Sequence, residues 1–288
     1  MVSYRYMFMN MQGMRDGTQD LSTQQVFARG FPVTPTQMTM EMHMLGIFYA
    51  PSDWVTLMLM GNYQSIEMDH RTRAGTPPRM MRGETFTTRG EDWGDTRLSA
   101  LIKFYDQNRA RAHFQLGVSA PTGSIDEEDP GTLPYAMQTG SGTWDLIFGP
   151  TYLKQYDYWS WGAQAIGMWR LGENDQDYSL GDHYSSTLWA AVPLTDAWSF
   201  SGRIGWMYSG AIEGSDSRLN PNVVPTAVPD FYERHRLDAA IGFNFYGQNG
   251  FLKGHRFAVE AALPIYEETG GPLLETDFWI TAGWQKAF

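Results

Sequence analysis

Apolar and polar residues alternate with a period of two along much of this chain. In one stretch, Leu98, Ile102 and Phe104 fall on one parity, whereas Arg97 and Lys103 fall on the other. Successive side chains of a β-strand point to opposite faces, so this alternation predicts strands with one apolar and one polar face. The pattern recurs along the sequence, and it predicts an all-β protein.

We predict a single domain that takes in residues 1–288, because all-β barrels and sandwiches of this length often form one unit. Each alternating segment has about a dozen residues, which is enough for a tilted strand to cross the hydrocarbon core of a membrane. The twelve predicted strands span residues 2–11, 38–50, 54–68, 93–105, 110–121, 142–153, 158–171, 182–194, 198–210, 232–246, 254–266 and 274–288.

The connections between these strands are alternately short and long. Alternation alone fits a soluble β-sandwich as well as a barrel, but short turns at one end and long loops at the other are typical of transmembrane barrels. We therefore predict an antiparallel up-and-down β-barrel in the outer membrane of a Gram-negative bacterium, with short periplasmic turns and long extracellular loops. The short turns lie near 51–53, 106–108, 155–157, 195–196 and 248–250, and the long loops at 12–37, 69–92, 122–141, 172–181, 211–231 and 267–273.

The two ends of the chain and the tryptophans agree with this prediction. The sequence opens on an alternating stretch instead of a signal peptide, so we expect a mature or trimmed chain. The last segment carries Phe278, Ile280, Trp284 and Phe288 on one parity, and a final aromatic residue on the lipid-facing parity is typical of outer-membrane barrels. Several tryptophans, such as Trp54, lie at segment ends, where indole rings can reach lipid headgroups.

Composition excludes several other classes of protein. Hydrophobic residues make up 42% of the chain and the mean hydropathy is −0.39, so a bundle of apolar membrane helices is excluded. The chain has no cysteine and therefore needs no disulfide framework. Its net charge is −11 and it has no long lysine- or arginine-rich run, so we predict no nucleic-acid partner.

Several short motifs are spread over nearly the whole chain. They are residues 3–7 (SYRYM), 38–46 (MTMEMHMLG), 49–53 (YAPSD), 121–125 (PTGSI), 133–138 (LPYAMQ), 140–143 (GSGT), 253–256 (KGHR) and 274–277 (LETD). In these motifs the sequence resembles a family of outer-membrane channels associated with the meta-pathway of phenol degradation. The resemblance implies a monomeric barrel of twelve strands whose outer loops fold inward, and a role in the uptake of small hydrophobic or aromatic compounds.

The predicted barrel is wide enough for a small solute. Twelve tilted strands about 4.8 Å apart give a backbone diameter of roughly 24 Å, and side chains leave roughly 12 Å. We expect loops 12–37 and 122–141 to form the constriction. The polar parity predicts these channel-lining residues: Arg5, Met7, Met9, Glu41, His43, Met58, Met60, Asp95, Arg97, Lys103, Arg111, His113, Asp145, Arg170, Arg203, Arg236, Asp238, Arg256, Glu260, Glu275 and Asp277. Their charges form either a structural network or a selective filter.

Seventeen methionines invite a second hypothesis, because methionine and histidine can bind soft Cu(I). Alternation argues against such a site in residues 38–44. It places the four methionines of this run together towards lipid and puts Glu41 and His43 in the lumen, so the methionines and His43 cannot jointly hold one ion without a bulge. Methionines on the lumen parity can instead form a ligand path, pack beneath an inward loop or bind metal. We predict no metal site and no cofactor.

No catalytic residue is predicted, and we expect the chain not to be an enzyme. Residues 69–70 (DH) and 181–186 (GDHYSS) have suitable residue types, but such clusters arise easily where strands meet loops. The acidic run 126–129 either binds divalent cations or is solvated. The predicted function is passive uptake of a small-molecule substrate by a monomer surrounded by outer-membrane lipid and lipopolysaccharide. The alternative is a non-transporting barrel that binds ligands or metal ions through its loops and its Met/His-rich lumen.

Overall fold

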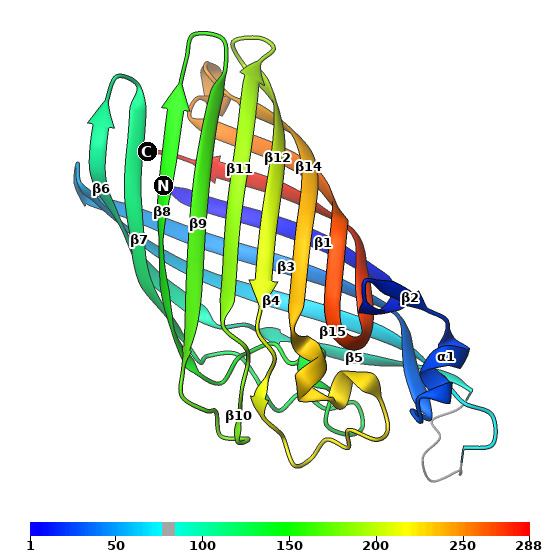
Figure 1. Cartoon of the computed structure of the whole chain (residues 1–288). Helices are drawn as coiled ribbons and strands as arrows, with labels where there is room; N and C mark the ends of the chain where they lie inside the picture. Colours follow the sequence, from blue (N-terminus) through cyan, green and yellow to red (C-terminus); the bar gives the residue numbers. More distant parts are fainter. Residues whose placement is uncertain (77–83) are drawn as a thin grey trace.

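Strands dominate the structure, a computed structural model that describes residues 1–76 and 84–288. Among these residues, eleven strand elements form an antiparallel ring, which the pairing of β1 with β15 closes (Figure 1). The elements are β1 (Val2–Gly17), β3 (Val33–Ser52), β4 (Val55–Thr72), β6 (Thr96–Gln107), β7 (Ala110–Ala120), β8 (Trp144–Gln155), β9 (Ser160–Leu171), β11 (His183–Pro193), β12 (Trp198–Ser209), β14 (Arg234–Tyr246) and β15 (His255–Lys286). The predicted antiparallel barrel is confirmed.

The element β15 contains a reversal of the chain within its 32 residues. Its first part pairs antiparallel with β14, from Arg256 to Thr269, and its second part pairs antiparallel with β1, as far as Lys286. A closed ring in which all neighbours are antiparallel must contain an even number of passes, so β15 supplies two of them. The eleven elements of the described chain therefore make the twelve passes that the sequence predicts.

One wall of the barrel is built from two elements in line. β4 pairs with β6 through residues 55–60 and with β5 (Thr85–Trp93) through residues 63–71. The break between β5 and β6 falls at Gly94 and Asp95. The predicted loop 69–92, of which residues 77–83 lie outside the described part of the chain, is therefore too long at both ends. Its threonines and aromatic residues favour a strand once β4 offers a partner, and that pairing cannot be seen in the local sequence.

Strand extension also shortens two other predicted loops. β1 continues to Gly17 and β3 begins at Val33, so only the middle of the predicted loop 12–37 lies outside them. The predicted loop 267–273 lies within β15. The shorter elements of the described chain are β2 (Gln19–Leu21), α1 (Thr23–Ala28), η2 (Tyr135–Met137), β10 (Tyr178–Ser179), β13 (Glu213–Gly214), η3 (Pro225–Ala227), η4 (Pro229–Tyr232) and η5 (Gly250–Leu252).

The sequence analysis missed α1, which has only six residues. It begins after Ser22, whose side chain accepts from the backbone N–H of Gln25 while the Gln25 side chain accepts from that of Ser22, a capping box. Val26 anchors the helix in a buried apolar cluster. Among the residues that the structure describes, no helix is long and apolar enough to span a membrane.

The outer surface of the ring is apolar. Leu98, Ile241 and Val259 come from well-separated strands, and their side chains are 52%, 58% and 53% exposed. Tryptophans at strand ends, such as Trp54 and Trp198, are also exposed. A band of this kind is unfavourable in water but suits hydrocarbon, and a closed ring leaves no backbone edge without hydrogen bonds. The chain is therefore an outer-membrane barrel.

The two ends of the barrel differ in structure (Figure 1). Short turns join the strands at the end where both termini lie, and we call this the turn end. Long connections with α1, β2 and β10 gather at the opposite end, which we call the loop end. This division agrees with the predicted alternation of short periplasmic turns and long extracellular loops.

Candidate functional site in the barrel interior

The strand register shows which methionines face the interior. Residues directly opposite each other on neighbouring strands point to the same face, and Met9 of β1 lies opposite Met40 of β3. Met9 packs against the buried Trp279, so both methionines point inward. The inward methionines of β1, β3 and β4 form what we call the methionine wall: Met7, Met9, Met11, Met14, Met38, Met40, Met42, Met44, Met58, Met60 and Met68.

The prediction that Glu41 and His43 line the lumen is wrong. Both share the outward parity of Leu45, which is 51% exposed. His43 is covered by the rings of Tyr4 and Tyr6, and its Nδ1 lies 2.8 Å from the Tyr4 hydroxyl. The parity of this run was misjudged because methionine is apolar enough for either environment. The register with β1, which decides the matter, is not visible in the sequence.

Charged residues cover the other side of the interior as ion pairs. Two guanidinium nitrogens of Arg203 donate hydrogen bonds to the Glu260 carboxylate, and the shorter of these contacts is 2.5 Å. Arg236 lies 2.8 Å from Asp238, and its guanidinium also stands 4.8 Å from the centre of the Trp279 ring. The set that we call the charged wall comprises Asp145, Arg170, Arg203, Arg234, Arg236, Asp238, Glu260 and Glu267.

A cavity of about 700 Å³ occupies the turn end of the interior. Three residues predicted to line the channel, Arg5, Arg256 and Glu260, border it. Trp189 borders it too and lies flat across Gly162, where an added Cβ would come within 2.2 Å of the indole. Glycine at this position therefore lets a large aromatic ring lie against the wall.

The charged residues of β6 and β7 that were predicted to line the channel differ in whether they form ion pairs. Lys103 and Arg111 share Asp106 at the turn end, at 2.8 and 3.3 Å. Arg97 lies opposite Met60 of the methionine wall and so points inward. Neither Arg97 nor His113 has an ion-pair partner among the described residues. Arg97 is therefore an inward cation that is not part of an ion pair among the described residues, although Asp95 and Asp145 act on it electrostatically.

The predictions that Glu275 and Asp277 line the channel are also wrong, and the reason is a β-bulge. The register between β1 and β15 shifts near Met11, so that Thr276 and Leu274 point inward. Glu275, their neighbour on the strand, points outward and pairs with Arg15 at 2.6 Å. Asp277 accepts a hydrogen bond from Asn10 on the outer side. Parity fails here because a bulge inserts one residue and reverses the alternation beyond it.

Two charged residues of the interior were missed by the sequence analysis. Arg234 lies 3.2 Å from Glu267, and Glu267 also accepts hydrogen bonds from the backbone and hydroxyl of Thr276. Arg234 shares the parity of Arg236 and Asp238, which could have revealed it. Glu267 fell in a predicted loop, where the alternation rule was not applied.

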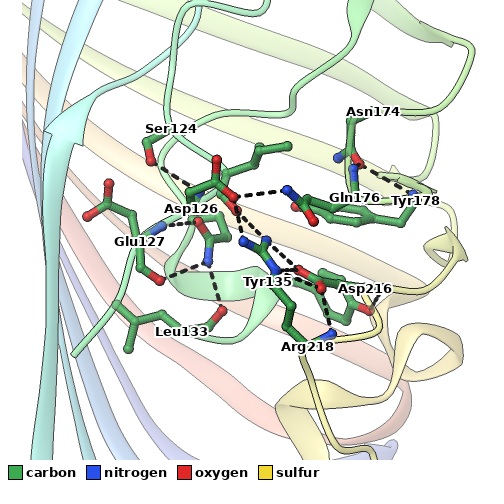
Figure 2. Close-up of polar contacts among 12 residues, drawn as sticks. Ser124, Asp126, Glu127, Leu133, Tyr135, Asn174, Gln176, Tyr178, Asp216 and Arg218 are labelled. Carbon is green, nitrogen blue, oxygen red and sulfur yellow. Dashed lines mark hydrogen bonds and ion pairs between the residues drawn. The ribbon is translucent and has the colours of Figure 1, made fainter. Parts of the chain in front are cut away.

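Three outer loops form a cap over the loop end, and Arg218 holds them together (Figure 2). Its guanidinium lies 2.6 Å from Asp126 and 2.7 Å from Asp216. Gln176 donates to the same Asp126 carboxylate. The hydroxyl of Tyr135 accepts from the backbone N–H of Asp216. The cap thus joins residues 122–141, 172–181 and 211–231, and Asp126 of the acidic run is an ion-pair partner within it.

Ionisation within the cap follows from these contacts. Burial disfavours the charged form of Asp216, but hydrogen bonds from Arg218 outweigh it and hold the pKa of this carboxyl below its usual value. Burial raises the pKa of Tyr178 to about 12. Tyr178 packs against Tyr135 and Ile212 in an apolar cluster. The cap therefore has a neutral aromatic centre and an ionised arginine–aspartate clamp.

The cap also enters the barrel. Leu133 and Met137 of loop 122–141 are buried against Met38 and Met68, and α1 adds Val26 to the same cluster. Asp95, at the break between β5 and β6, fastens this loop by accepting from the backbone and hydroxyl of Ser141, at 2.9 and 2.7 Å. Both loops predicted to constrict the channel therefore contact the methionine wall.

A second cavity, of about 300 Å³, lies beside this cap. Methionines border one side of it, and Arg170 and Arg234 of the charged wall border the other. No group of three His, Cys, Asp or Glu side chains suited to a metal ion occurs in the described part of the chain. The interior thus offers an apolar, sulfur-rich surface facing paired charges.

Comparison with known proteins agrees with this geometry. A family model described as "Putative MetA-pathway of phenol degradation" matches residues 11–261, whereas no curated protein matches the chain. The structure is similar to an outer membrane channel from Pseudomonas putida F1, with 15% identity, a TM-score of 0.66 and coverage of 100% of this chain and 94% of that chain.

Two other solved structures share the architecture. The transport unit of the autotransporter AIDA-I from Escherichia coli has 10% identity and a TM-score of 0.53, over 100% of this chain and 90% of that chain. The NanC porin has 6% identity and a TM-score of 0.51, over 100% of both chains. At these identities the likeness establishes the outer-membrane barrel fold.

Proposed function

This chain belongs to the family described as "Putative MetA-pathway of phenol degradation", and on that basis we propose that it is a channel for passive uptake of small hydrophobic or aromatic molecules. The two-sided interior is the observation that carries this proposal. Thioethers make favourable contacts with aromatic rings, and their flexible side chains adapt to different shapes. The arginines of the opposite wall can donate hydrogen bonds to a hydroxyl or carboxylate oxygen. An aromatic ring with one polar substituent matches both surfaces.

We further propose that the barrel acts as a monomer in outer-membrane lipid and lipopolysaccharide, and that it is not an enzyme. The clusters that resemble catalytic groups have structural contacts. His70 stacks on Phe86 at 4.7 Å, and the Asp69 carboxylate accepts from Thr87. The Nδ1 of His183 lies 2.8 Å from the hydroxyl of Ser209.

Single-channel conductance in planar bilayers tests the proposal. The wild-type barrel should conduct small ions, and added phenol or benzoate should reduce the current by occupying the interior. Arg97→Ala should change the ion selectivity, because it removes an inward cation that forms no ion pair among the described residues. Arg89→Ala is the matched control, since Arg89 is 71% exposed at the loop end and pairs with Glu67 there.

The outcome that contradicts transport is equally clear. A barrel that stays silent, and remains silent when Arg218→Met loosens the cap, supports the alternative role of a non-transporting binding protein. If phenol and benzoate leave the conductance unchanged, the result contradicts an aromatic substrate. It remains consistent with a channel.

A further inference from the structure

Three strands place thioethers in a row on the inner surface of the barrel. Met11 of β1 lies directly opposite Met38 of β3, and Met38 lies directly opposite Met68 of β4. Directly opposed residues on neighbouring strands have Cβ atoms about 4.5–5.5 Å apart and point to the same face. Three sulfur atoms on flexible side chains can therefore reach a common point.

The surroundings of this row are dry but reachable. Met38 and Met68 are 4% and 0% exposed, and both are covered by Met137 of the cap. The hydroxyl of Thr88 lies 3.2 Å from the Met137 sulfur, which fixes the position of this fourth thioether. The cavity of about 300 Å³ at the loop end touches the row, so a small ion can approach it from the interior.

We propose that Met11, Met38 and Met68 form a binding site for a soft monovalent cation, Cu(I) or Ag(I). Thioether sulfur is a soft ligand that selects such ions over Mg²⁺ or Ca²⁺. Methionine has three rotatable side-chain bonds, so the three sulfurs can close around an ion without moving the backbone. The ion binds as a simple Lewis acid, and neither an electron nor a proton is transferred.

Positive charge near the row does not oppose this binding. Arg170 and Arg234 border the same cavity, but each has its own carboxylate. Asp145 lies 2.5 Å from Arg170, and Glu267 lies 3.2 Å from Arg234. Each arginine is thus compensated by a carboxylate, which reduces its repulsion of a bound cation.

Further rows continue the surface towards the turn end. Met9 lies opposite Met40, and Met7 opposite Met42. Residues two apart on a strand are separated by about 6.5–7 Å, so the rows follow each other at that spacing. An ion bound at the first row can exchange its ligands for those of the next, and the methionine wall thus gives a soft cation a route along the barrel.

Silver titration of the purified, folded full-length barrel in detergent tests this site. The probe is AgNO₃ in chloride-free buffer, followed by calorimetry and by NMR of ¹³C-methyl-labelled methionine. We expect one strongly bound Ag(I) per chain. Each of the single changes Met38→Leu and Met68→Leu should weaken it by about 10–100-fold or more, the range seen when even an outer-shell partner of a metal is removed.

The matched control is Met58→Leu with Met60→Leu. These residues lie on the same wall, but their partners on β3 are Phe48 and Gly46, which carry no sulfur. Their replacement should leave the affinity for Ag(I) unchanged. Leucine conserves the volume and apolar character of methionine, so Met38→Leu should keep the fold of the barrel. Silver binding is measured without transport, so failure of the metal site is distinguished from failure of the proposed channel, which the conductance measurement tests.

Three results would overturn the site: no Ag(I) binding by the wild type, unchanged affinity in both single variants, or methyl shifts confined to Met58 and Met60. Heat-modifiable migration in gels shows whether each variant is folded, and the wild-type methyl shifts do not depend on any variant. Thioethers have no proton to lose, so affinity should be equal at about pH 5 and 7, whereas a histidine site would weaken on acidification. A weaker affinity at the lower pH also contradicts the assignment.

Discussion

The two walls of the interior show how one barrel can carry two kinds of surface. The methionine wall consists of neutral, flexible side chains, whereas each charged residue of the opposite wall depends on a partner at 2.5–3.2 Å. A thioether can change its contacts at little energetic cost. A buried charge cannot change its contacts so cheaply, because the loss of its partner leaves the charge uncompensated. The methionine wall should therefore tolerate substitutions that conserve volume, whereas the charged wall should not tolerate the loss of one partner.

The largest effect should come from breaking a pair of the charged wall. Glu267→Ala leaves Arg234 without its carboxylate partner and the Thr276 backbone N–H without its acceptor, and should lower the free energy of unfolding by about 3–5 kcal/mol. Urea unfolding of the barrel in lipid bilayers measures this loss. The double variant Arg234→Met, Glu267→Leu removes both charges, and its free energy of unfolding should be close to that of the wild type. A loss below about 1 kcal/mol in the single variant would show that lumen water compensates the arginine.

On the methionine wall the result should depend on volume and not on chemistry. Met68→Ala creates a cavity at a fully buried position and should cost about 2–5 kcal/mol. Met68→Leu keeps the volume and should cost less than about 1.5 kcal/mol. The same unfolding measurement compares them. Equal losses in the two variants would mean that the sulfur itself stabilises the fold, and would contradict the tolerance argued for this wall.

A smaller effect is expected at Gly162, beside the charged wall. Gly162→Ala places a methyl group 2.2 Å from the Trp189 ring and should destabilise the barrel by about 1–3 kcal/mol. Trp189→Ala in the same chain should remove this clash, so the double variant should lose less than the sum of the single changes. Additive losses would show that the ring does not press on Gly162.

The smallest effect concerns the cap, which spans both walls, and it depends on pH. Arg218 lowers the pKa of Asp216, so the clamp is fully present above the ordinary aspartate pKa of about 3.9 and is lost as the pH falls through the lowered value. Channel conductance should therefore rise as the pH falls below the ordinary aspartate pKa. Asp216→Asn should give the open level at neutral pH, whereas Asp196→Asn in a short turn should not. A conductance that does not change with pH would contradict this clamp.

The sequence predicts the barrel well because alternation repeats in every pass. Leu98 and Phe104 are assigned to the apolar face by this rule, and both are exposed. The faces of individual residues are less predictable where the alternation is ambiguous or interrupted. Glu41 was misplaced because methionine suits either face, and Glu275 because a bulge reverses the parity.

The cap lies beyond what pattern can predict. Its clamp joins Arg218 to Asp126 across 92 positions of the sequence. No local periodicity encodes a contact of this kind between irregular loops. Met137 is similar, because its burial depends on a loop turning inward, which sequence can suggest but not place.

The seam between β1 and β15 has a consequence for how the barrel assembles. Val2 pairs with Lys286, so the contact that closes the ring joins residues that lie far apart in the sequence. Contacts of such long range form slowly, because a large loop entropy must be overcome first. Until they form, two unpaired edges would face hydrocarbon, which is strongly unfavourable. Closure and insertion into the membrane must therefore occur together, as one late cooperative step of folding.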